Sequence, residues 1–186
     1  AQELGAAGAV LDVLERRHLE EMARLETGAR AEATGRLRSI ASRWRAIEWR
    51  GPGVASIRAG LARTYGRGLD DFVAVRSEPT ATSFHSWRRR VKYVRYQLEA
   101  IGAPRTLARR WLALGDDLGW EHDHTVLIGV CTTHAADDGF PSVAEHSRMR
   151  REELRSGALD AGDRLFLLEP DAFAESVTSA AGLEAR

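Results

Sequence analysis

The 186-residue chain has one cysteine, no long apolar run and no signal-peptide pattern in its first residues, and each of these shortages excludes a class of protein. Its single cysteine, Cys131, cannot form an internal disulfide and has no second thiol for a metal cage. No apolar run approaches the roughly 18 residues that a membrane-spanning helix needs, and the first residues lack the basic flank and apolar stretch of a signal peptide. We therefore expect a cytoplasmic protein without redox chemistry, in which Cys131 is a small buried apolar residue.

The positive and negative charges cancel over the whole chain, but they are unevenly distributed along it. Lys+Arg and Asp+Glu both number 27, so the formal net charge is zero, which alone argues against a polyanionic partner. Residues 36–110, however, contain 17 basic and 5 acidic residues, a net charge of +12, and the flanking segments are net acidic. Lys92 is the single lysine. The middle of the chain is therefore the place to look for an anion-binding surface.

Strand signals are also almost absent, whereas apolar residues recur at three- and four-residue spacing along the whole chain, as in amphipathic helices. We predict an all-α fold made of antiparallel helical bundles. The first two predicted helices carry apolar faces, and the second ends at the break formed by residues 51–53. The residues of these faces are Val10, Leu14, Met22 and Leu25, then Leu37, Ile40, Trp44 and Ile47.

Proline and glycine suggest the bounds of the later helices. We expect a third helix from about Val54 to the polar stretch at Ser77, and a fourth over residues 80–101. A fifth is expected to start at Pro104, and a sixth to follow Gly119 and end by Gly139. Pro141 and Pro170 are each expected at the first turn of a further helix, because proline suits that position.

The predicted helix over residues 80–101 carries the informative pattern. At 100° per residue, its apolar side chains form one side and its cations form the opposite side over about 16 Å. The apolar side consists of Trp87, Val91, Val94 and Leu98. The cationic stripe consists of His85, Arg88, Arg89, Lys92, Tyr96 and Glu99, with Arg95 at its margin.

No acidic residue lies between His85 and Leu98 to neutralise these cations. A solvated helix normally alternates Glu with Arg at i,i+4, because like charges at that spacing repel each other. An anion from outside the helix is therefore expected. Two sources remain open: a bound ligand, or neighbouring carboxylates such as Asp116 and Asp117 in an ordinary ion-pair network.

The motif His85-x-x-Arg88-Arg89-x-x-Lys92-x-x-Arg95-Tyr96 resembles the signature of the CHAD (conserved histidine α-helical) domain, His-x-x-Arg-Lys-x-x-Lys-x-x-Arg-Tyr. Residues 60–68 are similar to the Gly/Tyr/basic helix that precedes it in this family. Residues 114–127 and parts of residues 150–173 resemble its downstream segments, so the resemblance covers roughly residues 55–175. Tyr93 is a departure, because that position is often basic.

The resemblance implies a duplicated fold, in which two bundles each present a basic, histidine-containing helix to a shared central cavity. Only one such helix is present here. We therefore expect residues 1–182 to form a single CHAD-like domain whose first basic helix lies upstream of residue 1, with a frayed tail over residues 183–186.

By the same resemblance, the expected function is non-catalytic binding of inorganic polyphosphate, in some members at polyphosphate granules. No cofactor, metal or catalytic residue is implied. His85 would donate a hydrogen bond when neutral and add a charge when protonated, and the arginines and the lysine would make charge-assisted hydrogen bonds. The implied binding residues are His85, Arg88, Arg89, Lys92, Arg95, Tyr96, Arg63 and Arg67.

Alternatives remain for several of these residues. Arg63 and Arg67 share a helix face at i,i+4 and could instead form surface ion pairs with Asp70 or Asp71. The same cations could bind RNA, but only Tyr93 and Tyr96 interleave with them as stacking aromatics. The five tryptophans are not obvious stacking platforms, because Trp44, Trp87 and Trp111 fall on apolar helix faces and are expected in the core.

A metal-dependent phosphohydrolase is the third alternative, suggested by Glu121-His122-Asp123-His124, since imidazole and carboxylate are suitable metal ligands. Adjacent helical residues point about 100° apart, however, and no second cluster at i,i+4 completes a metal shell. We therefore predict that His122 and Asp123 do not converge on one point and that a structural or capping role is favoured.

Overall fold

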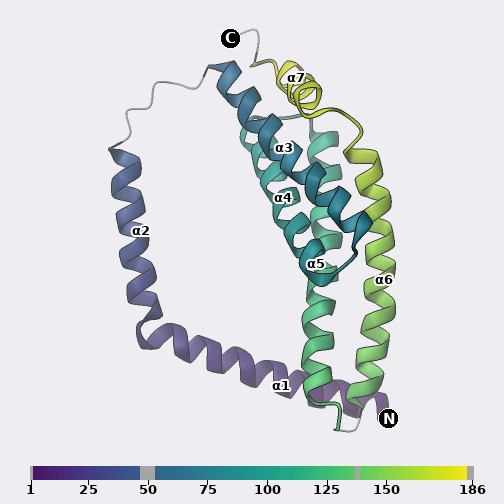
Figure 1. The fold of residues 1–186 in the computed structure, drawn as a ribbon. Helices are drawn as coiled ribbons and strands as arrows, with labels where there is room; N and C mark the ends of the chain where they lie inside the picture. The colour runs from purple at the N-terminus through teal and green to yellow at the C-terminus, as the bar shows by residue number, and fades with distance from the viewer. Residues whose placement is uncertain (1, 47–52, 137–138, 184–186) are drawn as a thin grey trace. The chain divides into compact units, whose positions relative to one another are not determined.

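The structure is a computed structural model that describes residues 2–46, 53–136 and 139–183, and these residues contain helices and no strand (Figure 1). The predicted all-α class is therefore confirmed. None of the described helices has the length and apolar content needed to cross a bilayer. The elements are α1 (Gln2–Arg24), a π-helical turn (Leu25–Ala29), α2 (Arg30–Arg45), α3 (Val54–Ser77), α4 (Ala81–Ala100), α5 (Arg105–Thr133), α6 (Phe140–Leu165) and α7 (Pro170–Ala180).

The chain divides into two compact units, of which the smaller comprises residues 1–51 and 131–143. Val10 is buried there as expected. Leu14 is half-buried, whereas Met22, Leu25, Leu37 and Ile40, which the sequence placed on the apolar faces of the first two helices, are exposed. Helical periodicity predicts that an apolar face exists but not what covers it. Ile47, the break at residues 51–52 and the side chain of Trp44 lie outside the described residues.

The larger unit comprises residues 52–130 and 144–186 and contains α3, α4, α7 and most of α5 and α6. Here α4 begins and ends as predicted. Thr80 caps its first turn: the Thr80 hydroxyl oxygen accepts a hydrogen bond from the Ser83 backbone N–H at 3.1 Å, and the Ser83 hydroxyl oxygen accepts one from the Thr80 N–H at 3.0 Å. This reciprocal capping fixes where the basic helix starts.

The two helices expected to meet at Gly119 are one continuous helix, α5 (Arg105–Thr133), so that prediction was wrong. Glycine in a helix interior costs only about 1 kcal/mol relative to alanine. Beyond Gly119, the buried side chain of Val130 and the buried Glu121, which is paired with Arg155 on α6, offset this cost when the helix runs on. Tertiary burial therefore overrides the local break signal.

The core of the larger unit lies between α3, α4, α5, α6 and α7 and is rich in aromatic rings. Trp87 and Trp111 are fully buried, which confirms their predicted place in the core. Tyr65 stacks on Phe173 with ring centroids 4.0 Å apart, and its hydroxyl donates a hydrogen bond to the Leu165 carbonyl oxygen at 3.2 Å. Burial raises the pKa of Tyr65. The hydroxyl therefore stays protonated and ties α3 to the end of α6.

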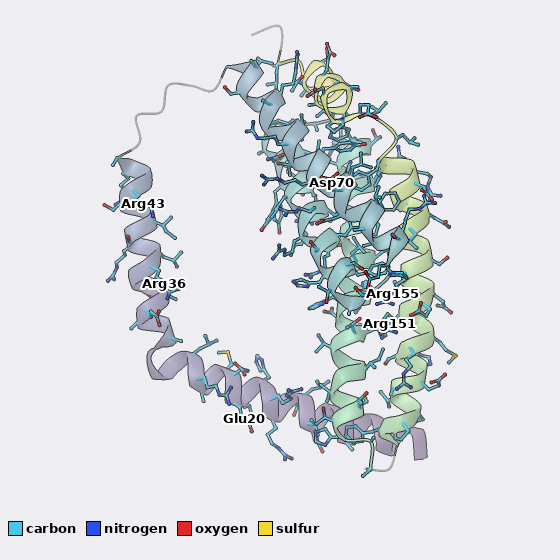
Figure 2. The ribbon with its side chains drawn as sticks, viewed as in Figure 1. Glu20, Arg36, Arg43, Asp70, Arg151 and Arg155 are labelled. Carbon is cyan, nitrogen blue, oxygen red and sulfur yellow. The ribbon has the colours of Figure 1, made fainter. Side chains whose placement is uncertain are left out.

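A nearly buried ion pair joins α5 to α6 below the first turn of α4. Arg155, which Figure 2 labels on α6, lies with its Nη2 2.8 Å from Glu121 Oε1, and its guanidinium carbon lies 4.5 Å from the centroid of the Phe84 ring. Because both charged groups are largely removed from water, each needs the other in place. The pair therefore fixes the positions of the three helices around the N-terminal end of the basic stripe.

Candidate functional site

The exposed side of α4 forms one wall of a groove of about 500 Å³, and α5 forms the opposite wall. From the predicted stripe, α4 contributes Arg88, Lys92, Arg95 and Tyr96. The α5 wall consists of Gly115, Asp116, Gly119, Trp120 and Asp123. These four residues of the stripe therefore face a groove, while the apolar back of the helix is fully buried, as predicted.

Two glycines at i,i+4 on α5 explain why the groove is open. A Cβ atom built on Gly119 would meet no heavy atom within 4 Å, and one built on Gly115 would reach only Val91 Cγ1 at 3.9 Å. Because residues four apart share one helix face, the two missing side chains leave a continuous hollow beside α4. The glycine that suggested a helix break in the sequence therefore shapes the site instead.

Arg88 and Lys92 form no ion pair in the part of the chain that the structure describes. No carboxylate of those residues lies within 4.0 Å of either side chain, although Asp116 lines the same groove. The Nε atom of Arg88 is buried and has no hydrogen-bond partner among them. An ordinary ion-pair network with Asp116 and Asp117 therefore does not account for these two residues.

Arg95 differs from its neighbours, because its own helix partly neutralises it. Its Nε lies 3.3 Å from Glu99 Oε1, and its guanidinium carbon lies 4.7 Å from the centroid of the Tyr96 ring. This surface pair is weak, since side-chain entropy and solvent screening offset most of the attraction. Arg95 thus lies at the groove with its charge partly offset by Glu99.

A second hollow, of about 350 Å³, lies on the other side of Tyr96, between α3 and α4. Arg67 lines it from α3, whereas Arg63, one turn earlier on the same helix, does not. Asp70, labelled on α3 in Figure 2, forms no ion pair with Arg67 within the described chain. Asp71 instead lies 3.4 Å from the Nε of Arg90. The lining residues are Thr64, Arg67, Arg90, Tyr93, Tyr96 and Gln97.

Three of the predicted binding residues line neither hollow. Arg63 on α3 and Arg89 on α4 are exposed and unpaired among the described residues. His85 is also exposed, and its imidazole ring lies against that of His122 on α5, with centroids 5.1 Å apart. The stripe thus continues past the groove to a pair of histidines.

The suggested metal cluster on α5 is not assembled. His122 faces His85, whereas Asp123 lines the groove. Across the described residues, no group of three or more His, Cys, Asp and Glu side chains is placed to hold a metal ion. Nearby, burial raises the pKa of Asp117 and the Asp116 carboxylate raises it further, against the opposing effect of Arg150.

Sequence reasoning missed several residues at these hollows: Arg90, Trp120, Asp116 as a wall residue, Gln97 and Thr64. Gln97 donates a hydrogen bond to the Thr64 hydroxyl at 2.9 Å, a contact between α3 and α4 that no local spacing encodes. Trp120 could have been found from its helix phase, because it falls opposite Trp111 and Leu118 once α5 is read as one helix. The predicted break at Gly119 hid that phase.

The comparisons agree with the motif. The family model described as the CHAD domain matches residues 1–132, which is well over half of the chain, so the chain belongs to the CHAD domain family. The match spans α1 to α5, whereas the resemblance seen in residues 150–173 lies beyond it. The family is known in general for polyphosphate binding without catalysis. No curated protein and no solved structure matches the chain significantly.

Proposed function

We propose that this protein binds inorganic polyphosphate non-covalently along the cationic face of α4, without catalysing a reaction on it. The observation that carries the proposal is the state of Arg88 and Lys92. Both face a groove, and neither has a carboxylate partner among the described residues. Unneutralised cations held together on one helix are costly unless an anion is supplied. Membership of the CHAD domain family supports polyphosphate as that anion.

The spacing of the cations suits a polyanion with regularly repeated charges. Arg88 and Lys92 are one helical turn apart, a rise of about 6 Å along α4, and Arg95 follows in the same groove. His85, Arg89, Arg63 and Arg67 extend the positive surface beyond the groove on both sides. In this proposal each cation donates charge-assisted hydrogen bonds to a phosphate oxygen, and Tyr96 donates its hydroxyl.

Binding through a row of cations has a characteristic response to salt. Each phosphate that is neutralised releases condensed counterions, so the affinity falls steeply as the salt concentration rises. The proposal places the protein with polyphosphate in the cell, including at polyphosphate granules. RNA carries the same repeated charge, so RNA is used as a competitor of polyphosphate in the test.

The decisive experiment reverses two charges in the groove. We expect Arg88→Glu with Lys92→Glu to abolish binding of long-chain polyphosphate while the helical content and the melting temperature, followed by circular dichroism, stay nearly unchanged. A single Arg88→Ala should weaken binding about tenfold, because one charge-assisted hydrogen bond contributes about 1–2 kcal/mol.

A matched control separates the effect of changing the groove from the effect of changing the net charge of the protein. Arg105→Glu with Arg109→Glu makes the same change of net charge at exposed i,i+4 positions on α5 that line neither hollow. This control should retain most of the affinity. The proposal is rejected if wild-type binding ignores salt, if RNA displaces polyphosphate at equal phosphate concentration, or if the double reversal in the groove behaves like the control.

A further inference from the structure

The α5 wall of the groove has a chemistry that does not suit a bare phosphate chain. Trp120 lies at its centre with 62% of its surface exposed, whereas Trp87 and Trp111 are fully buried. Asp116 and Asp123 lie four residues before it and three residues after it, so all three share one face of α5 and line the same groove. This wall therefore presents one aromatic ring flanked by two carboxylates.

Each of these groups restricts what can lie against the wall. A carboxylate only accepts hydrogen bonds, so it repels phosphate oxygens and binds N–H or O–H donors. An exposed indole ring in contact with water gains most when a flat, apolar ring stacks on it. The complementary ligand surface is therefore an aromatic ring that carries hydrogen-bond donors.

The α4 wall, on the opposite side of the groove, is complementary to a negatively charged part of the ligand. Arg88 and Lys92 on α4 are free of carboxylate partners within the described chain and are suited to phosphate. The groove's volume of about 500 Å³ lies within the ordinary range for small-molecule sites, roughly 300–1,000 Å³. A molecule that joins a donor-bearing aromatic base to a short phosphate chain satisfies both walls at once.

We propose that this groove binds a nucleoside oligophosphate, with its base stacked on Trp120 and its phosphates on Arg88 and Lys92. Asp116 and Asp123 accept hydrogen bonds from the exocyclic amino group of the base or from the ribose hydroxyls. The inference rests on the proposed function only in that the α4 wall holds phosphate. It adds a second ligand class, which competes with polyphosphate for the same cations.

The test compares ligands that differ by the nucleoside alone. ATP, inorganic triphosphate and adenosine are each titrated into the full chain by calorimetry at low salt, with EDTA present so that no divalent ion bridges phosphate and carboxylate. We expect ATP to bind about tenfold more tightly than triphosphate, which corresponds to the lower part of the range for base stacking on an aromatic side chain. Charge cannot produce this preference, because triphosphate is the more highly charged ligand. Adenosine should bind more weakly than either.

Variants assign the preference to Trp120. Trp120→Ala should remove the preference for ATP over triphosphate, and Trp120→Phe should restore most of it, because phenylalanine keeps a ring for stacking. Leu112→Ala is the matched control, since Leu112 is an exposed apolar residue of α5 that does not line the groove. That control should keep the full preference. Lys92→Glu should weaken ATP and triphosphate alike.

The outcomes separate this inference from the proposed function. Equal affinities of the wild type for ATP and triphosphate, or a preference for ATP that survives Trp120→Ala, would overturn the nucleotide site and leave polyphosphate binding standing. If the wild type binds neither triphosphate nor long-chain polyphosphate, both conclusions are wrong.

Discussion

The imidazole rings of His85 on α4 and His122 on α5 lie 5.1 Å apart between centroids, with their planes inclined by 45°. The pair therefore joins the two helices that form the groove, at the N-terminal end of the cationic stripe. Each imidazole can donate a hydrogen bond to an anion. Arg88 and Arg89 follow His85 within one turn, so the histidine pair lies beside a surface that is already positive.

We expect the histidine pair to add to the affinity for long-chain polyphosphate, because an imidazole N–H can donate a hydrogen bond to a phosphate oxygen. Loss of one such bond should lower the affinity about fivefold. Binding measurements at constant ionic strength and constant pH test this.

Two variants test the contribution of this histidine pair. His85→Ala with His122→Ala should lower the affinity, while His18→Ala, which changes an exposed histidine on α1, should leave it unchanged. An unchanged affinity in the double variant would show that the pair does not contact the ligand.

The groove itself can be tested through Gly119 without changing any charge. Gly119→Ala should raise the free energy of unfolding by about 0.5–1 kcal/mol, because alanine is the better helix former and its Cβ meets no heavy atom within 4 Å. Gly119→Leu projects a larger side chain into the groove and should weaken polyphosphate binding although the helix is retained. Chemical denaturation and binding measurements on the same preparations separate the two effects.

The control for filling the groove is Gly157→Leu on α6. Gly157 is exposed, has no heavy atom within 4 Å of a built Cβ, and lines neither hollow. Equal loss of binding in the Gly119 and Gly157 variants would show that the groove between α4 and α5 is not where the ligand lies.

The sequence predicted α4 well because its signals are local and agree. Thr80 and Ser83 provide a reciprocal cap, and one apolar stripe opposes one cationic stripe, so both the bounds and the buried face follow from periodicity. The groove was only half predictable. Its α4 wall is readable from one helix, whereas its α5 wall depends on Gly119 remaining helical, which tertiary burial decides.

The spacing of residues along the sequence could not predict which side chains contact each other between helices. Asp71 was considered as a partner for Arg63 or Arg67 on its own helix, but it pairs with Arg90 on α4 and accepts a hydrogen bond from the Ser86 hydroxyl at 2.8 Å. The choice depends on how α3 and α4 pack, which brings residues about 15–19 positions apart into contact. Exposure of Met22 and Leu37 is a second case, since an apolar face in a sequence does not specify its cover.

The ion pair between Glu121 and Arg155 should be important for stability. Glu121→Ala leaves the guanidinium of Arg155 largely buried without its closest carboxylate, and breaking such a pair costs about 3 kcal/mol. We expect a clear fall in the melting temperature with little direct effect on the phosphate contacts, because neither residue lines the groove. Arg148→Ala, which breaks an exposed pair with Glu145, is the matched comparison and should change stability by less than about 1 kcal/mol. Similar losses of stability in the two variants would mean that the ion pair between α5 and α6 stabilises the fold no more than an exposed pair does.

Replacing Asp117, in contrast to Glu121, should stabilise the folded protein. Burial, and then the neighbouring Asp116 carboxylate, raise the pKa of Asp117 above its ordinary value, so the ionised form is disfavoured in the folded state. Above that raised pKa the aspartate is ionised in both folded and unfolded chains, and the folded state bears the whole penalty. As the pH falls through the raised pKa towards the ordinary value, the folded chain takes up a proton first and the penalty disappears. Asp117→Asn should therefore raise the free energy of unfolding at pH 7, by about 0.5 kcal/mol once solvent screening of a partly exposed group is allowed for.

The gain in the Asp117→Asn variant should shrink to nothing in acid, below the ordinary pKa of an aspartate, because the wild-type carboxyl is then neutral in both states. Urea denaturation at several pH values measures this directly. Asp160→Asn on α6, at an exposed position, is the matched control and should show no such trend. A gain that is constant with pH would mean that the amide improves packing or hydrogen bonding instead, and a loss of stability at pH 7 would mean that Arg150 holds the Asp117 carboxylate more strongly than burial and Asp116 oppose it.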